Sequence, residues 1–320
     1  MMLLNDINFF SYLNNLKCFE KYPHVAVGVS GGPDSIALVY LINKWIKSKQ
    51  GKLSALIFDH KIRSNSEKES YYVRDILREL NINARILKIK KNKLIKKNME
   101  QARNNRFEGL ITFCKKNNIQ HLFLGHHFDD NLETYLIRKI NGSNFEGLGS
   151  MEEITYFKKI QILRPFIKIK KNSILSFNKK NKLIFVNDPS NKDVNYTRVK
   201  VRNFLQNNKY KKLIKNDFMN LKKEIPYYRN MVWRCLIDTL AEVKPKSIKI
   251  NSNNLLKFDD LIIEKIILLC LKFFSDQKYK ARSSTITLFI SEMKKSRFKI
   301  FNLTGVSIKK NDDLLTFFQK

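Results

Sequence analysis

Hydrophobic and polar positions alternate along the first two hundred residues in an order that predicts strands and helices in turn. An apolar run at 25–29 is followed by a helical pattern from Ile36, and this order recurs along the chain. Short apolar runs are typical of buried parallel strands, and amphipathic stretches are typical of the helices that cover them. The predicted strands are 25–29, 53–58, 84–87 and 121–124, and the helices between them are 36–47, 64–80 and 101–115. This order predicts an α/β fold with a doubly wound parallel sheet covered on both faces.

The pattern changes after about residue 209. A further strand is predicted at 184–186, and beyond the change Lys-rich helical stretches replace the strand–helix alternation. An apolar helix is predicted around 261–269, and 298–318 is predicted to form short strands that turn at 304–305 and 311–313. We therefore predict two domains, 1–209 and 210–320, of which the second is smaller and of helical or α+β type.

The stretch Ser30-Gly31-Gly32-Pro33-Asp34-Ser35 lies between the first predicted strand and the first predicted helix. Such a turn directs backbone N–H groups and the positive helix end at one point, which suits a phosphate group. Its glycines permit close approach, and Ser30 and Ser35 add hydroxyl donors. A carboxylate such as Asp34 repels phosphate unless a cation lies between them, which implies Mg²⁺. An ordinary strand-to-helix turn, the alternative, needs neither Asp34 nor both serines.

Two other phosphate-binding motifs are excluded at this turn. A Walker A loop requires a lysine that the stretch 30–35 lacks, and a dinucleotide-binding turn requires a different glycine spacing. The turn is therefore expected to bind phosphate by its own arrangement of glycines, serines and an acid.

A second group of chemically capable side chains lies at 125–140. His126 and His127 precede several acids, among them Asp130 and Glu133. Acids near a helix start are favoured by the helix dipole, and they suit Mg²⁺ or a substrate ammonium group. An N-terminal cap plus surface acids is the alternative, but this many histidines and acids exceed what a cap needs. Zinc is disfavoured because the HExxH pattern is absent and no cysteine is nearby.

Asp59 and His60 end the second predicted strand. The carboxyl ends of parallel strands meet at one edge of a sheet, where ligands commonly bind. We therefore expect Asp59-His60, the turn at 30–35 and Gly125-His126-His127 to line one crevice.

The chain is strongly basic. It carries 61 Lys and Arg against 29 Asp and Glu, a formal net charge of +32, and its pI is about 9.9. A polyanionic partner, best a nucleic acid, is expected from this charge. Lysine is abundant everywhere, so part of the basicity reflects general composition. Arg198 and Arg202, four residues apart, suit phosphate recognition on one helical face.

The cysteines and the apolar runs indicate the compartment. The four cysteines are far apart and form neither a CxxC motif nor a disulfide framework, which fits a reducing cytosol. The apolar run 261–274 is interrupted by charges, and no other run is long enough for a bilayer. We expect a soluble, cytoplasmic protein with no membrane partner.

In this order, the motifs resemble the N-type ATP pyrophosphatases (the SGGxDS family) and, within them, the tRNA(Ile)-lysidine synthetases. The resemblance covers about residues 24–203, and it is weak beyond them. The turn at 30–35 specifies only the superfamily, whereas the later motifs specify the narrower group. These motifs are Asp59-His60 with Arg63, Gln101-Ala102-Arg103-x-x-Arg106-Phe107, Gly125-His126-His127-Phe128-Asp129-Asp130-Asn131-Leu132-Glu133-Thr134, Arg138, Gly142-Ser143, Gly147-Leu148, Met151, Arg164-Pro165, Asp188-Pro189-Ser190-Asn191 and Tyr196-Thr197-Arg198.

The resemblance implies an adenine nucleotide alpha hydrolase-like fold and a tRNA-modifying ligase. Such enzymes use ATP to adenylate the C2 carbonyl oxygen of wobble cytidine 34 in tRNA(Ile) with a CAU anticodon. The amine of free lysine then displaces AMP and gives lysidine. ATP and Mg²⁺ are the implied cofactors, and the basic domain 210–320 is implied to bind tRNA phosphates. An oligomer is possible.

The resemblance also implies roles for particular residues. Arg106 and Arg198 are expected to steady the ATP phosphates or the activated cytidine, and Glu133 is expected to attract the lysine ammonium. The metal ligands expected are Asp34 and Asp130. The residues expected to bind ATP are Ser30, Gly31, Gly32, Pro33, Asp34, Ser35, Asp59 and His60. The catalytic residues expected are Asp34, Arg106, Asp130, Glu133 and Arg198.

Departures from the family pattern, at Asn131, Val199, Met99 and Lys61, and three alternatives accompany this interpretation. The family usually has Gln where Asn131 stands and Asn where Val199 stands. A tRNA thiolation enzyme of the same superfamily is the first alternative, and it requires cysteines that carry sulfur or a cluster. A non-catalytic RNA-binding relative is the second, but it would be expected to lack Asp34 or Asp130. A small-molecule synthetase, the third, leaves the basic C-terminal half unexplained.

Overall fold

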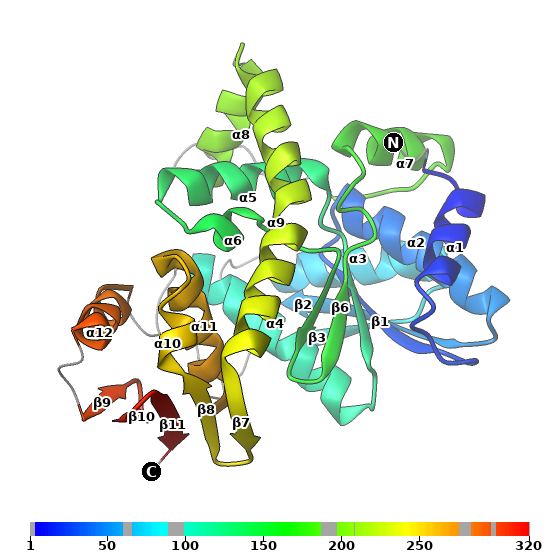
Figure 1. The fold of residues 1–320 in the computed structure, drawn as a ribbon. Helices are drawn as coiled ribbons and strands as arrows, with labels where there is room; N and C mark the ends of the chain where they lie inside the picture. The colour runs from blue at the N-terminus through cyan, green and yellow to red at the C-terminus, as the bar shows by residue number, and fades with distance from the viewer. Residues whose placement is uncertain are drawn as a thin grey trace. The chain divides into compact units, whose positions relative to one another are not determined.

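A six-stranded sheet forms the centre of residues 1–219, one of the two units into which the chain divides; the other is 220–320 (Figure 1). The strand order is β3 (Ala84–Lys88), β2 (Lys52–Asp59), β1 (His24–Val29), β4 (His121–Leu124), β6 (Ile160–Leu163) and β5 (Ile154–Phe157). The first five of these run parallel, which confirms the predicted doubly wound sheet. The computed structural model describes residues 4–59, 66–88, 99–186, 197–207, 209–274, 283–295 and 299–319.

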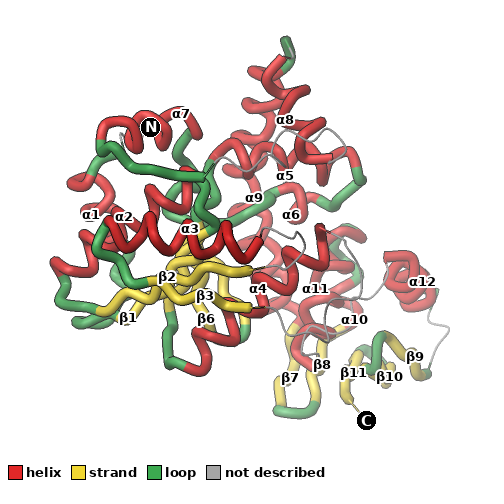
Figure 2. The backbone as a smooth tube through the Cα atoms, turned by 180° about the vertical axis from the view of Figure 1, so that it is seen from behind, coloured by secondary structure: helices red, strands yellow, loops and turns green. Residues whose placement is uncertain are grey.

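The side chains of β1 show how the sheet separates two apolar layers. Val25, Val27 and Val29 belong to one core cluster, whereas Ala26 belongs to another, because successive strand residues point to opposite faces. Figure 2 shows α2 and α3 along one side of the strands. The helices that contribute to the first cluster are α1 (Asp6–Asn15), α2 (Pro33–Ser48), α3 (Ser66–Glu79) and α7 (Lys171–Lys180), and the helix of the second is α4 (Met99–Lys116).

Two features of this unit differ from the sequence prediction. Strands β5 and β6 form an antiparallel hairpin at the sheet edge, which the sequence analysis missed. The predicted strand at 184–186 is wrong, because these residues form no strand pairing. The N–H of Val186 instead donates to the carbonyl oxygen of Gly31 at 2.9 Å, so this segment runs along the turn after β1.

Helices beyond the carboxyl end of β4 complete the unit. These are α5 (Phe128–Ile140), α6 (Phe145–Leu148), α8 (Thr197–Asn207) and the beginning of α9 (Lys211–Thr239). Phe218 of α9 is buried, with ring centroids 6.1 Å from Phe128 and 5.1 Å from Tyr135. The Tyr135 hydroxyl donates to the carboxylate of Asp217 at 2.5 Å. These contacts pack the beginning of α9 against α5.

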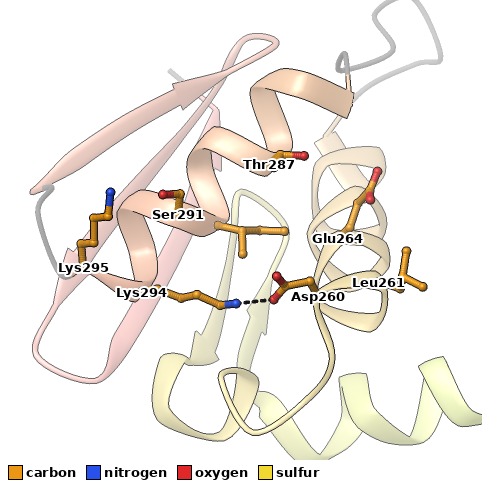
Figure 3. A pocket seen from close by; sticks show the side chains of 8 residues that line it. Asp260, Leu261, Glu264, Thr287, Ser291, Lys294 and Lys295 are labelled. Atoms are coloured by element: carbon orange, nitrogen blue, oxygen red, sulfur yellow. Dashed lines mark hydrogen bonds and ion pairs between the residues drawn. The ribbon is translucent and has the colours of Figure 1, made fainter.

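The second unit contains a five-stranded antiparallel sheet with helices over one face. Its strand order is β7 (Leu240–Lys244), β8 (Ser247–Asn251), β11 (Leu314–Gln319), β10 (Val306–Asn311) and β9 (Ile300–Leu303). Buried residues of α11 (Asp260–Phe274) and α12 (Ser283–Lys294) form one core with alternate strand residues, and the short α10 (Ser252–Leu255) follows β8. Figure 3 shows α11 and α12 in front of this sheet.

Several predictions for this unit are confirmed, and one hairpin was missed. Helix α11 covers the apolar stretch predicted around 261–269, and the predicted turns carry positive φ angles at Thr304, Gly305 and Asp312. The β7–β8 hairpin was not predicted, because most of β7 is exposed and its sequence lacks a clear alternation. In the part of the chain that the structure describes, no helix is long and apolar enough to cross a membrane.

Candidate active site

The turn after β1 has a conformation that only glycine fits well. Gly31 has a φ angle of +84°, and a Cβ there would lie 2.4 Å from Cγ2 of Val73. Gly32 is the N-cap of α2, so no capping side chain covers the first-turn N–H groups, and Pro33 follows as the first helical residue. The turn therefore presents backbone N–H groups and the positive end of a 16-residue helix to whatever binds there.

The two serines of the turn have different environments. Ser35 is buried, and its hydroxyl donates to the carbonyl oxygen of Gly32 at 2.9 Å. The same hydroxyl accepts the N–H of Ser30 at 3.2 Å, so it closes the turn. Ser30 is exposed, and its own hydroxyl lies 3.2 Å from that of Ser35. Ser35 therefore shapes the turn, and Ser30 offers its hydroxyl at the surface.

A close approach of two chain segments joins this turn to the stretch after β4. A Cβ on Gly125 would lie 3.2 Å from the backbone carbonyl of Asp34 and from the backbone nitrogen of Ser35. Backbone atoms cannot move aside as a flexible side chain can, so glycine permits this approach. The approach places 125–130 beside the beginning of α2, which brings the two sequence motifs together.

His127 lies between the two acids predicted to hold a metal. It is the buried N-cap of α5, and its Nδ1 accepts the N–H of Asp130 at 3.3 Å while its own N–H donates to that carboxylate at 3.2 Å. Since Nδ1 accepts, Nε2 carries the ring hydrogen. Nε2 lies 3.4 Å from Oδ2 of Asp130 and 3.8 Å from Oδ1 of Asp34. The two acids therefore converge on one imidazole.

The electrostatic environment keeps Asp130 ionised and His126 neutral. Burial raises the pKa of Asp130, but its interactions with His127 and His126, a hydrogen bond from the His127 backbone and the charge of Arg198 outweigh it, so the pKa is lowered overall. Burial lowers the pKa of His126 to about 3, and Arg164 and neighbouring arginines act in the same direction. The Nδ1 atom of His126 is buried and has no hydrogen-bond partner among the described residues.

Three arginines lie near these groups. Desolvation, followed by the charges of Arg198 and Arg106, lowers the pKa of Arg103 to about 10. Desolvation and the charge of Arg198 likewise lower the pKa of Arg106. Arg198 donates to the hydroxyl of Thr134 at 2.9 Å. No described carboxylate forms an ion pair with these three guanidinium groups, so their positive charge suits a polyanionic ligand.

Glu133 has a partner that the sequence analysis did not anticipate. Arg202 donates from Nε to one carboxylate oxygen of Glu133 at 2.7 Å and from Nη2 to the other at 3.2 Å. Glu133 is 2% exposed, and the hydrogen bond from Arg202 to it raises the pKa of Arg202. This pair joins α5 to α8, and it separates the roles of Arg198 and Arg202. The expected role of Glu133 in attracting an ammonium group stays a prediction.

Lys171 was also missed by the sequence analysis. Its Nζ lies 2.7 Å from Oδ1 and 2.6 Å from Oδ2 of Asp34. It stands in a lysine-rich stretch, 168–171, in which no pattern distinguishes it from its neighbours. Only the packing of α7 on α2 brings it to the site.

The remaining predicted residues lie at the edge of the described region. Asp59 is buried at the end of β2, beside β1 in the sheet. His60, Arg63, the motif at 188–191 and Tyr196 lie outside the described residues. Among the departures from the family pattern, Asn131 exchanges hydrogen bonds with the backbone of Met151 at 3.0 and 2.7 Å. Val199 is buried in α8, where an apolar side chain suits the packing.

Asp34 and Asp130 suit a magnesium ion that binds together with a nucleotide. Within the described ranges, no three His, Cys, Asp or Glu side chains converge in a way that would hold a metal ion by themselves. Mg²⁺ is usually bound through one or two carboxylates together with substrate phosphates. Asp34 and Asp130, both close to one imidazole nitrogen, supply such a pair.

A separate pocket in the second unit contains none of these residues. It has a volume of about 480 Å³ and lies between α11 and α12 (Figure 3). The Nζ of Lys294 bonds to Asp260 across its mouth at 2.5 Å. The groups that line it include neither a glycine turn nor a cluster of acids, so it is not the predicted site.

The fold and this site define a class of protein: an α/β protein whose first strand–helix turn has a shape that suits a phosphate group. A family model described as a PP-loop domain matches residues 6–209. Proteins named tRNA(Ile)-lysidine synthase match more of the chain. The one from Wolbachia pipientis wMel is 29% identical over 97% of this chain and 72% of its own length, and the one from the Wolbachia of Brugia malayi is 30% identical over 89% and 68%.

The chain belongs to the PP-loop family and, within it, to the tRNA(Ile)-lysidine synthase family of enzymes. A relative of the same name from Orientia tsutsugamushi is 32% identical over 63% of this chain, which spans 45% of that protein. Among solved structures, the U34-tRNA thiolase NcsA from Methanococcus maripaludis with its [4Fe-4S] cluster has a TM-score of 0.53 and 20% identity, over 68% of this chain and 80% of that one. This likeness concerns the fold alone.

Proposed function

We propose that the protein ligates lysine to wobble cytidine 34 of tRNA(Ile) with a CAU anticodon, at the expense of ATP. In the first step the C2 carbonyl oxygen of cytidine attacks the α-phosphorus of ATP and pyrophosphate leaves. In the second step an amine of free lysine attacks C2. The C2–O bond then breaks, AMP leaves with that oxygen, and the amine loses a proton. The product is lysidine.

One observation carries this proposal. Asp34 and Asp130 converge beside the turn at 30–35, and the three arginines described above (Arg103, Arg106 and Arg198) lie near them. Ser30, Gly31, Gly32, Pro33 and Ser35 hold the pyrophosphate portion of ATP through backbone and hydroxyl groups. Mg²⁺ neutralises phosphate charge when it is bound, and Asp34 and Asp130 are its ligands from the protein.

The arginines and the remaining acids bind the other parts of the substrates in this proposal. Arg106 and Arg198 bind the phosphates or the adenylated cytidine, where negative charge develops. Glu133 draws the lysine ammonium towards the intermediate. Asp59 and His60 complete the ATP site at the end of β2.

Charge supports a tRNA partner. The formal net charge of +32 favours a polyanion, and the second unit contributes a Lys-rich surface for tRNA phosphates. Binding to such a surface weakens with rising salt, because each neutralised phosphate releases counterions. The homologues' name supports tRNA(Ile) as the particular substrate.

Thiolation of tRNA is less well supported, because all four cysteines are poor nucleophiles. Cys114 and Cys270 are buried, and burial raises the pKa of each thiol to about 12. Burial also raises the pKa values of Cys18 and Cys235. None of the four pairs with another in a disulfide. A sulfur carrier or an iron–sulfur cluster requires thiolates that lie together.

The test is an assay of product with the full chain, ATP, Mg²⁺, lysine and a tRNA with a CAU anticodon. We expect lysine-dependent release of AMP and pyrophosphate, and mass spectrometry of the digested tRNA should find lysidine. A requirement for glutamine or a sulfur donor in place of lysine would overturn the proposal. The Asp34→Ala variant should lose adenylation and keep tRNA binding, whereas retained turnover would remove Asp34 from the mechanism.

A further inference from the structure

Lys171 stands at a position where a lysine is locally unfavourable. It is the first residue of α7, and the positive end of a helix repels a cation there. The first turn of α7 carries no acidic residue that would offset this repulsion. The compensating carboxylates come from other helices: Asp34 of α2 binds the Lys171 ammonium, and Asp129 of α5 accepts its backbone N–H at 2.8 Å.

The packing of α7 holds Lys171 in place. Asn178, fully buried on the same helix, donates from Nδ2 to the carbonyl oxygen of Pro33 at 2.9 Å. Ile174 is also fully buried, in the core cluster that includes α2. The side chains of Lys171 and Asp34 are 31% and 23% exposed. Their ion pair is therefore a positioned contact between two packed helices, unlike the solvent-exposed pairs that contribute little.

We infer that Lys171 is a positioning residue that holds Asp34 until a divalent cation and ATP replace it. Its ammonium lies 2.7 and 2.6 Å from the two oxygens of the Asp34 carboxylate. A metal ion bound to the same carboxylate would be repelled by this nearby positive charge, so the metal competes with Lys171 for Asp34 and favours its displacement. This inference rests on the ATP-dependent function proposed above.

The displaced ammonium then has an alternative partner. ATP phosphates bound at the turn 30–35 lie beside Asp34, and an ammonium group is a suitable phosphate ligand. Without nucleotide, release of Lys171 leaves its charge unpaired near a helix N-terminus. With nucleotide, the phosphates offset that charge. Metal and nucleotide binding thus become mutually favourable, because each relieves the cost of the other.

The test measures metal binding to the full chain without tRNA or lysine, with Mn²⁺ as the probe and electron paramagnetic resonance as the readout. We expect Lys171→Met to bind Mn²⁺ about tenfold more tightly than the wild type, a change typical of one charge-assisted hydrogen bond. In the presence of a non-hydrolysable ATP analogue, the same variant should lose most of the mutual enhancement between metal and nucleotide. Lys171→Arg should keep Asp34 occupied and bind Mn²⁺ no more tightly than the wild type.

Lys168→Met is the matched control. It removes the same charge three residues away, from an exposed ion pair with Glu153 at 2.7 Å, and its Mn²⁺ affinity should equal that of the wild type. An unchanged Mn²⁺ affinity in folded Lys171→Met, or an equal rise in Lys168→Met, would overturn the inference. If Lys171→Met does not fold, tighter Mn²⁺ binding by Lys171→Arg would also contradict it. Failure of lysidine formation with these metal results intact would overturn the proposed function alone.

Discussion

The turn at 30–35 and the α5–α8 region bear on the same site but are built in different ways. The turn depends on local backbone: a glycine with positive φ, a glycine N-cap and a buried serine hydroxyl within six residues. The α5–α8 region depends on side chains far apart in the sequence, such as Glu133 with Arg202. A local turn is specified by its own residues, whereas contacts between residues far apart in the sequence depend on the packing of the whole unit.

Of these two regions, the turn at 30–35 should be the easier one to disrupt completely by a single substitution. In Gly31→Ala a Cβ would lie 2.4 Å from Val73 on a backbone with a φ angle of +84°, so the turn must change shape. We expect ATP affinity to fall by at least about a hundredfold, since the N–H groups lose their common direction. Isothermal titration calorimetry with ATP and Mg²⁺ measures this.

Gly142→Ala is the control for that experiment. Gly142 also has a positive φ angle, +65°, but a Cβ there would meet nothing within 4 Å. It should cost about 1 kcal/mol of stability through backbone strain alone and leave ATP affinity unchanged. If the two variants affect ATP binding equally, the shape of the turn does not determine nucleotide affinity.

Substitutions in the α5–α8 region should lower the stability of the protein rather than its affinity for nucleotide. Glu133→Gln leaves Arg202 without its bidentate partner, and we expect a loss of about 1–3 kcal/mol in the free energy of unfolding. Chemical denaturation of each single variant and of the double variant Glu133→Gln/Arg202→Met gives the coupling between them. Additive losses would show that the pair does not join the helices. A rise in the KM for lysine in Glu133→Gln alone would support its proposed substrate role.

His126, which lies just before α5, gives this part of the site a pH-dependent stability. The pKa of His126 is about 3 in the folded protein and about 6.5 in an unfolded chain, so the unfolded state binds more protons between these values. Stability should therefore decrease as pH falls below about 6.5, by up to about 1.4 kcal/mol per pH unit for this one proton. Denaturation of wild type and His126→Gln between pH 7 and 5 tests this. Parallel curves for the two proteins would contradict a neutral, buried His126.

The smallest expected effect concerns the support of α5 from α9. Tyr135→Phe removes the hydroxyl that donates to Asp217 and accepts from Lys139 at 3.1 Å. We expect a loss of about 0.5–1.5 kcal/mol in unfolding free energy, the usual worth of one hydrogen bond, and no change in ATP affinity. Tyr22→Phe, at an exposed position, should change neither quantity. A large loss of ATP affinity in Tyr135→Phe would mean that α5 is positioned from this side.

The same contrast explains how much the sequence could predict. The turn at 30–35, the helix α11 and the turns near 304 and 312 follow from residues close together, and local patterns identified them. The hairpin β5–β6 and strand β7 were not predicted, because short or exposed strands show little alternation of hydrophobic and polar residues. Lys171, and the pairing of Arg202 with Glu133, were not predicted for another reason. Lys171 and Arg202 are two of 61 basic residues, and only tertiary packing selects their partners.

The central claim is that the first strand–helix turn and the acid-bearing start of α5 form one nucleotide site. A crystal structure of the full chain with Mg²⁺ and a non-hydrolysable ATP analogue tests it most directly. The account predicts phosphates against the N–H groups of residues 31–35 and a metal ion between Asp34 and Asp130. An analogue bound away from this turn, or a metal ion that contacts neither acid, would contradict it.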